Sequence, residues 1–313
     1  MLRWAILGTG AAAARRYAPA MRAAGHDLAV VASRSLTRAQ AFAANHGVRR
    51  ARSGYEEALA ADDVDAVLVA LPNASHERWA VAAMQAGKHV LCPAPAAPDA
   101  EATGRMAAAS ATTGRLLVEG VAARHHPRFA AVRDLLWAGG IGEVRLLTAC
   151  ASRPVPDGRN HRTRVDEGGG ALLDLGVHAV AITRTLAGTE PVAVQGLQTR
   201  WSTGVDGTTG AVLVFPTGAV ATLQASFDAR PYGALQIVGT DGILSLDDPF
   251  DAGPADEVSL LRDGDVVGTW RADPFERLVS GFAETAAGAG DVDGIDDAVA
   301  TAAVLDRIRD AAQ

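Results

Sequence analysis

The sequence has few lysines, few cysteines, no positive net charge and no long apolar run. Lys88 is the only lysine among 313 residues. Cys92 and Cys150 lie far apart without metal-type spacing, so we expect two buried cysteines and no metal site. The net charge of −7 argues against a nucleic-acid partner, because such binding relies on Lys and Arg. No apolar run reaches the about 18 residues that cross a bilayer, so we expect no membrane partner either.

Length and composition indicate a globular protein with two domains. Single hydrophobic cores stop growing near about 250 to 300 residues, and this chain of 313 residues is 49% hydrophobic and 21% charged. It opens on the strand-like LRWAILG without the zones of a secretory signal, so we expect a cytoplasmic protein. With nucleic acid and membrane disfavoured, we expect a small-molecule substrate.

Two different patterns divide the chain. In residues 1–120 the apolar runs RWAILG, LAVVAS, AVLVAL, HVLC and RLLVEG alternate with Ala-rich helical segments, which predicts βαβ units and a doubly wound parallel sheet. From Val192 onward, successive strand patterns are joined by the turn signals PTG, TDG and DGD, and helical patterns follow over about 274–288 and 294–312. We therefore predict an α/β domain over 1–120 and an α+β domain over 121–313 with a large, mostly antiparallel sheet.

A glycine motif joins the first expected strand to the first expected helix. Gly8, Gly10 and Ala13 have G-x-G-x-x-A spacing, with Thr9 between the glycines. Gly8 would allow a tight turn, Gly10 would let a pyrophosphate approach the backbone, and Ala13 would let the helix pack on the strand. In this strand-turn-helix context the motif predicts dinucleotide binding, and the alternative is a structural glycine turn.

The end of the second expected strand bears on the choice of cofactor. An acidic residue usually accepts hydrogen bonds from the ribose of NAD at this place, whereas here the strand ends in Ser33 and Arg34. A hydroxyl and a guanidinium bind a phosphate and do not replace a carboxylate. We therefore expect NADP(H) rather than NAD(H), unless Arg34 is only a solvated loop residue.

Several motifs together resemble one enzyme family. The segments GTGAAA, LPNASH, AGKHVLC, EGVAARHHP, GGIGEVR and GGGALLDLGVHAVAITRTLAG resemble the Gfo/Idh/MocA oxidoreductases in order and spacing, and EGVAARHHP is most similar to the dihydrodiol dehydrogenase and sugar ketoreductase branches. The resemblance implies a Rossmann domain, a C-terminal domain whose open sheet commonly forms contacts in a homo-oligomer (dimer or tetramer), and NAD(P)-dependent chemistry on sugars, diols and related compounds.

The resemblance fails at one motif of the family's site. The family has Glu-Lys-Pro after the fourth strand, and its lysine is thought to hold the reacting oxygen of the substrate. This chain has Pro93, Ala94 and Pro95 there. Lys88 cannot replace the lysine, because the family places it at the helix exit before the strand. We therefore expect an atypical site.

Asp174 and His178 match the family's acid/base pair. They are four residues apart, so both would project from one face of a helix. Histidine can exchange a proton near neutral pH, and a neighbouring carboxylate would favour its charged form. The further Asp that the family often has is Ala181 here. The alternative is that Asp174 caps a loop and His178 is a core histidine.

Other polar residues are weaker candidates for the two sites. Leu71, Asn73 and His76 follow the third strand, where the family meets the nicotinamide side of the cofactor, although helix capping is an alternative. Arg124, His125 and His126 follow the fifth strand, and one of them, with Arg124 and His126 preferred, could supply the positive charge that Ala94 lacks. His161 and Arg162, in the loop DGRNHRTR, could form a lid or only a solvated loop.

Three functions remain open from the sequence. The first is an NADP(H)-dependent oxidoreductase for a small sugar-like, ketone or imine substrate, with His178 exchanging the proton and Asp174 orienting it. The second is a non-redox enzyme, such as a cyclase, eliminase, epimerase or hydrolase, that uses the same pair with bound or transiently used NADP. The third is a catalytically silent binding protein.

Overall fold

The chain forms two compact units in the computed structural model, which describes residues 1–155 and 160–312. The first unit is Met1–Gly120 with Phe275–Val299, and the second is Val121–Pro274 with Ala300–Gln313. The division after Gly120 agrees with the expected domain boundary. The expectation that everything after residue 121 forms the second domain is wrong for residues 275–299, which belong to the first unit.

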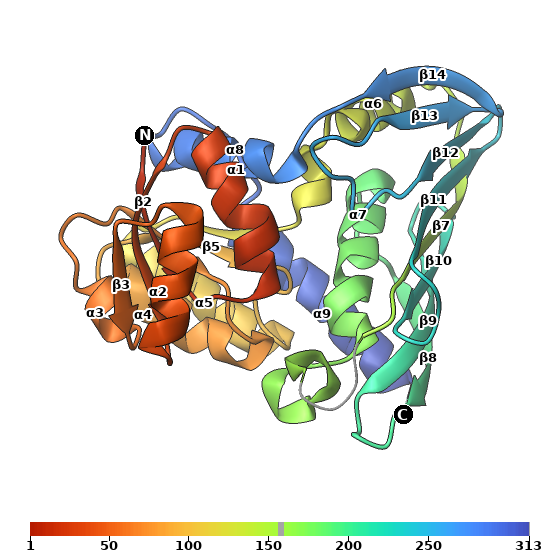
Figure 1. The fold of residues 1–313 in the computed structure, drawn as a ribbon. Coiled ribbons are helices and arrows are strands. Elements are labelled where there is room, and N and C mark those ends of the chain that lie inside the picture. The colour runs from red at the N-terminus through yellow and green to blue at the C-terminus, as the bar shows by residue number, and fades with distance from the viewer. Residues whose placement is uncertain (156–159, 313) are drawn as a thin grey trace. The chain divides into compact units, whose positions relative to one another are not determined.

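The first unit contains a parallel sheet of six strands, β1 to β6 (Figure 1). The strand order is β3-β2-β1-β4-β5-β6, and all neighbours are parallel, so the predicted doubly wound fold is confirmed. Its strands are β1 Arg3–Leu7, β2 Asp27–Ser33, β3 Arg50–Ser53, β4 Ala66–Val69, β5 His89–Pro93 and β6 Leu117–Gly120. Its helical segments are η1 Ala13–Tyr17, α1 Ala18–Ala23, α2 Leu36–His46, α3 Glu56–Leu59, η2 Asn73–Ser75, α4 His76–Gln85, α5 Ala100–Thr113, α8 Pro274–Ala286 and the start of α9 Ile295–Ala311.

Both faces of this sheet are buried, which explains the continuous apolar runs in its strands. Alternate residues of β1 point to opposite faces: Ala5 and Leu7 belong to one core cluster that also includes residues of α4 and α5. Trp4 faces the other way and its ring packs against Phe282 of α8, with the ring centroids 5.0 Å apart.

Apolar contacts explain why residues 275–299 join the first unit. Besides the contact of Phe282, Phe275 packs edge-on against Tyr17 at 5.1 Å between ring centroids. Ile295 and Ala298 of α9 are buried in the core cluster of the parallel sheet. A chain segment lowers its free energy by burying apolar surface, and here the complementary surface is on the first unit.

The second unit contains a sheet of eight strands in the order β14-β13-β12-β11-β7-β10-β9-β8. Only β7 and β10 are parallel neighbours, so the predicted mostly antiparallel sheet is confirmed. Its strands are β7 Val144–Ser152, β8 Ala193–Arg200, β9 Asp206–Val214, β10 Val220–Ser226, β11 Tyr232–Gly239, β12 Ile243–Asp247, β13 Val258–Arg262 and β14 Asp265–Trp270. Its helical segments are η3 Ala122–His125, α6 Pro127–Trp137, η4 His161–Thr163, η5 Val165–Glu167, η6 Leu172–Gly176, α7 Val177–Ala187 and the end of α9.

Helix α7 lies along one face of this sheet (Figure 1) and contacts β7 and β10. In β10, Leu223 and Ala225 are buried, whereas Thr222 and Gln224 alternate with them and are exposed. The other face carries exposed apolar side chains, among them Leu146, which is 50% exposed.

One helical stretch, Val165–Ala187, is long and apolar enough to cross a membrane by length and composition alone. However, 72% of its most apolar window is buried inside the protein. A helix in the core of a globular protein is also apolar on all sides. The stretch includes α7, and the burial of this helix explains why the stretch is apolar.

Candidate active site

The glycine turn after β1 is backed by the loop that follows β4. Gly8 has a φ of +100°, and a Cβ at this position would lie 2.2 Å from the carbonyl oxygen of Ala70. Only glycine fits that conformation and that contact. A Cβ at Gly10 would meet no described atom within 4 Å, so the backbone there faces open space. This is the geometry that lets a phosphate group approach backbone N–H groups.

The helix after the glycine turn begins with a π-helical segment, η1. Ala13 is completely buried at its start, which agrees with the need for a small residue there. Tyr17 ends the segment and is also buried, and burial raises the pKa of its phenol. Its hydroxyl would lie 2.4 Å from a Cβ at Gly120, so glycine at the end of β6 makes room for this side chain. Wide turns of this kind occur frequently at functional sites.

The carboxyl end of β2 is polar and basic. Ser33 is buried, and its hydroxyl accepts a hydrogen bond from the backbone N–H of Ser35 at 3.3 Å. Arg34 and Arg38 are exposed. Burial raises the pKa of Tyr55, and the charges of these two arginines oppose that shift. Arg38 was missed in the sequence, although it stands four residues after Arg34 in the first turn of α2.

His76 connects the loops that follow β4 and β5. It is 1% exposed, with Nδ1 3.0 Å from the carbonyl oxygen of Pro95 and Nε2 2.8 Å from that of Leu71. Burial lowers its pKa, and the carbonyl groups partly oppose that shift. Leu71 lies beside the glycine turn: a Cβ at Gly8 would be 3.1 Å from the Cδ2 atom of Leu71. His76 thus holds the loops that surround the turn, while Asn73 opens the short helix η2 before it.

No charged side chain stands at residue 94. Ala94 is half-buried just after the carboxyl end of β5. Lys88 precedes the opposite end of that strand, and its Nζ donates to two backbone carbonyl groups at 3.0 and 2.9 Å. Five strand residues span about 16 Å, so Lys88 lies well away from Ala94.

In the second unit, Asp206 caps the helical stretch that carries the expected acid/base pair. Its Oδ2 accepts hydrogen bonds from the backbone N–H of Leu172 and the hydroxyl of Thr209, both at 2.7 Å. Burial raises the pKa of this carboxyl group. A Cβ at Gly170, where φ is +119°, would lie 2.0 Å from its Oδ1. The cap comes from β9, and no local sequence signal identifies it.

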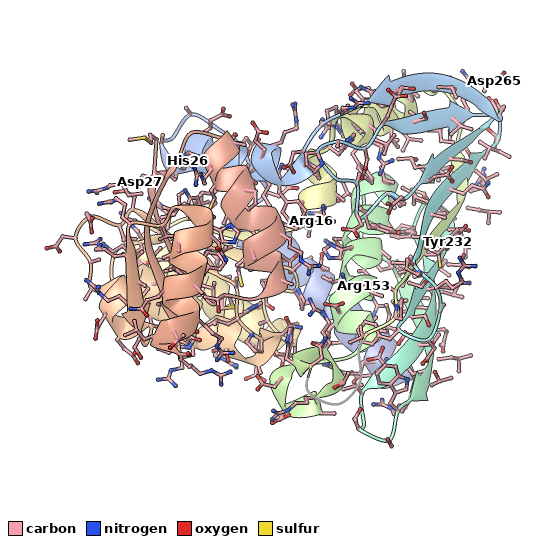
Figure 2. All side chains as sticks on the ribbon, in the orientation of Figure 1. Arg16, His26, Asp27, Arg153, Tyr232 and Asp265 are labelled. Carbon is pink, nitrogen blue, oxygen red and sulfur yellow. The ribbon has the colours of Figure 1, made fainter. Side chains whose placement is uncertain are left out.

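Asp174 lies in the π-helical segment η6 and is held by two arginines. Arg153 donates from Nη2 to Oδ2 at 2.5 Å, and Arg162 donates from Nε to Oδ1 at 2.6 Å. Burial works to raise the pKa of Asp174, but the two guanidinium groups outweigh it and lower the pKa. Arg153, labelled in Figure 2, directly follows β7. In the sequence, only the place of Arg153 at the end of an expected strand could suggest a role.

His178 is a neutral imidazole at neutral pH. Burial is the largest influence and lowers its pKa to about 4, while Asp174 opposes the shift and Arg153 adds to it. Asp251 and Arg124 act more weakly and in opposite directions. Asp174 does favour the charged form of His178, as expected from its position, but burial outweighs this effect and keeps the imidazole neutral.

Arg124 and His126 have contacts that account for them structurally. Arg124 donates from Nη2 to the carbonyl oxygen of Ala181 on α7 at 2.8 Å. His126 is 2% exposed, and its Nδ1 accepts a hydrogen bond from the backbone N–H of Arg128 at 3.2 Å. It thereby caps α6. His125 ends η3, between these two residues.

The basic loop after β7 is partly outside the described residues, which omit 156–159. His161 and Arg162 begin η4, and Arg162 binds Asp174 there. Part of the expected lid lies outside the described residues, whereas Arg162 contacts Asp174. Among residues 1–155 and 160–312, no three His, Cys, Asp or Glu side chains are grouped so that they could hold a metal ion.

Comparisons with known proteins agree with this architecture. Residues 2–121 match the oxidoreductase family with an NAD-binding Rossmann fold, and residues 129–245 match the GFO/IDH/MocA C-terminal domain. A dTDP-3,4-didehydro-2,6-dideoxy-alpha-D-glucose 3-reductase of Streptomyces violaceoruber is 36% identical, covering 99% of this chain and 95% of its own. A D-xylose 1-dehydrogenase (NADP(+)) of Haloferax volcanii is 35% identical over 90% and 88% of the two chains.

A solved structure is similar over the whole chain. The 3-ketoreductase from Actinomadura kijaniata, in complex with NADP and TDP-benzene, has a TM-score of 0.91 and 29% sequence identity. The match covers 100% of this chain and 98% of that one. These matches confirm the resemblance to sugar ketoreductases. The chain belongs to the GFO/IDH/MocA family of oxidoreductases.

Proposed function

We propose that this protein is an NADP(H)-dependent oxidoreductase that transfers a hydride between the nicotinamide and a small sugar-like, ketone or imine substrate. The observation that carries the proposal is the glycine turn, with Gly8 against the Ala70 carbonyl and open space at Gly10. Both named relatives are sugar enzymes by name: one is a D-xylose dehydrogenase and the other is a dTDP-sugar reductase. NADP, when bound, supplies a carbon that accepts or donates the hydride.

The end of β2 supports NADP rather than NAD. Ser33, Arg34 and Arg38 offer hydrogen-bond donors of the kind that bind the 2′-phosphate. The sequence has no acidic residue between Asp27 and Glu56, so no carboxylate follows β2 to receive the ribose hydroxyl groups of NAD. The Haloferax volcanii relative is named for NADP(+), and the Actinomadura kijaniata enzyme was solved with NADP.

The proton chemistry rests on His178. A neutral imidazole accepts a proton, so the free protein already has the protonation state needed to oxidise an alcohol. His178 takes the hydroxyl proton while the hydride leaves the same carbon, and the carbonyl product forms. In the reverse direction the imidazole must first gain a proton, which costs free energy because its pKa is about 4. Asp174 and Arg153 act on His178 through their charges.

The proposal is tested by turnover of candidate alcohols with NADP⁺. Nicotinamide absorbance should rise in proportion to the product formed, with D-xylose among the first substrates. NAD⁺ at the same concentration should give a slower rate. Product without any change in absorbance would contradict net redox chemistry.

Ala94 supports a second candidate function, a non-redox reaction on the same fold. The family lysine that this position lacks would stabilise charge on the reacting oxygen, and losing one such donor costs about 10² to 10³ in rate. His178 could then catalyse elimination, epimerisation, cyclisation or hydrolysis with NADP bound or used transiently. The third candidate, a catalytically silent binding protein, predicts NADP binding without any product. The same absorbance assay, combined with product analysis, separates the three.

We also propose a homo-oligomer that associates through the open face of the eight-stranded sheet, in the cytoplasm. Leu146 on β7 is 50% exposed, Val212 on β9 is 40% exposed and Tyr232 on β11 is 61% exposed. Strands β11 and β7 are neighbours, and β9 follows after β10; exposed apolar side chains on one face of a sheet are typical of interaction surfaces. Sedimentation should show a dimer or tetramer for the wild type and a smaller species for Leu146→Glu. A monomeric wild type would contradict the proposal.

A further inference from the structure

The arginine clamp, which we define as Arg153, Arg162 and Asp174, carries a net positive charge. Two guanidinium groups share one carboxylate whose pKa is lowered, so the charges sum to one positive unit at neutral pH. The side chains of Arg153 and Arg162 are 42% and 26% exposed. Residues 156–159, which are not described, contain one Asp and one Arg, so their own charges cancel.

The clamp offers hydrogen-bond donors and few acceptors. Each oxygen of Asp174 already accepts from an arginine, so this carboxylate is poorly placed to accept a hydrogen bond from a sugar hydroxyl. Arg153 uses only Nη2 and Arg162 only Nε, and the other guanidinium N–H groups donate to no group among the described residues. Arg164, the next arginine along the chain, differs because it is paired with Asp166 and lies near Glu167.

We propose that the arginine clamp binds an oxyanion of the substrate, a carboxylate or a phosphate group. A guanidinium fork matches both groups in shape and charge. His178 follows Asp174 by four residues, or about 6 Å along a helix axis, so the oxyanion would lie a few bonds from the carbon that reacts. The inference rests on the proposed function and specifies its substrate class as anionic sugars or related hydroxy acids.

The test is a calorimetric titration of the NADP⁺-loaded protein with D-glucuronate, D-glucose 6-phosphate and D-glucose. These ligands share a pyranose ring and differ at carbon six. We expect at least one anionic sugar to bind about tenfold or more tightly than D-glucose, because charge-assisted hydrogen bonds are stronger than neutral ones. Preference for glucuronate would identify a carboxylate, and preference for the phosphate ester would identify a phosphate. Equal affinities, or no measurable binding of either anion, would overturn the proposal.

Three variants separate binding from a merely structural role. Arg162→Gln should weaken binding of the preferred anion about tenfold and leave D-glucose unchanged, whereas Asp174→Asn should tighten anion binding. Arg164→Gln is the matched control and should change neither. If Arg162→Gln and Asp174→Asn shift the anion affinity in the same direction, the clamp only supports the fold and the proposal fails. The readout is binding, so failure of redox turnover or of NADP⁺ binding remains separately visible.

Discussion

The glycine turn in the first unit and the arginine clamp with His178 in the second are built in different ways. The turn is made from backbone that is continuous in sequence. The nearest group from elsewhere in the chain is the carbonyl of Ala70, which leaves no room for a side chain at Gly8. The clamp unites side chains from the end of β7, from η4 and from η6. A backbone site depends on conformation, so its sequence motif is nearly sufficient. A side-chain site depends on which distant groups the fold brings together.

The largest expected effect is on the side-chain site, from His178→Ala. Removing the proton acceptor should lower kcat about 10² to 10⁴-fold. The affinity for NADP⁺ should stay within about twofold of the wild-type value, because His178 is not part of the glycine turn. Steady-state rates and a fluorescence titration of the cofactor measure the two quantities. Full activity in this variant would remove His178 from the mechanism.

The backbone site is tested by comparing Gly8→Ala with Gly10→Ala. Alanine at Gly8 meets the Ala70 carbonyl and a positive φ, so the free energy of unfolding should fall by about 2 to 4 kcal/mol. Alanine at Gly10 meets no described atom, so that variant should keep its stability and lose affinity for NADP⁺. Thermal unfolding and cofactor titration of both variants check this. Equal stabilities of the two variants would show that the carbonyl of Ala70 does not pack closely against Gly8.

The pKa of His178 makes stability depend on pH. The folded state takes up this proton only near pH 4, whereas the unfolded chain takes it up near pH 6.5. Between these values the unfolded state binds more protons, so lowering the pH destabilises the fold, by about 2 kcal/mol after allowance for partial exposure. Denaturant unfolding of the wild type and of His178→Gln should show a shallower acid loss in the variant. Parallel curves would mean that the imidazole is not neutral.

The smallest expected effect concerns the choice of cofactor at the end of β2. Arg34→Gln and Arg38→Gln should each weaken NADP⁺ binding about tenfold, because each removes one charged contact to the 2′-phosphate. Binding of NAD⁺ should not change, since it lacks that phosphate. Competition titrations with both coenzymes measure the ratio. A similar loss for NAD⁺ would indicate that these arginines support the fold of α2 instead.

The sequence predicted the two sheets and the division at residue 120, and it predicted where the expected pair would stand on a helix. It failed at residues 275–299, because the partner of Phe282 is Trp4, far away in sequence. The sequence showed the carboxylate that favours a charged His178, but it did not show the burial that outweighs this effect. The four-residue spacing of Asp174 and His178 suggested a helix, and Asp174 lies in a π-helical segment capped by Asp206 from β9.

By itself, the sequence determined the alternation of strands and helices, the glycine turn and the absence of lysine at residue 94, because each depends on local periodicity or on the identity of one residue. The tertiary structure alone decided the partners of Asp174, the protonation of His178 and the burial of His76. Those properties depend on charge and solvent exclusion summed over groups from separate strands and loops. Burial and ion pairing act through space, and the linear order of residues does not contain those distances.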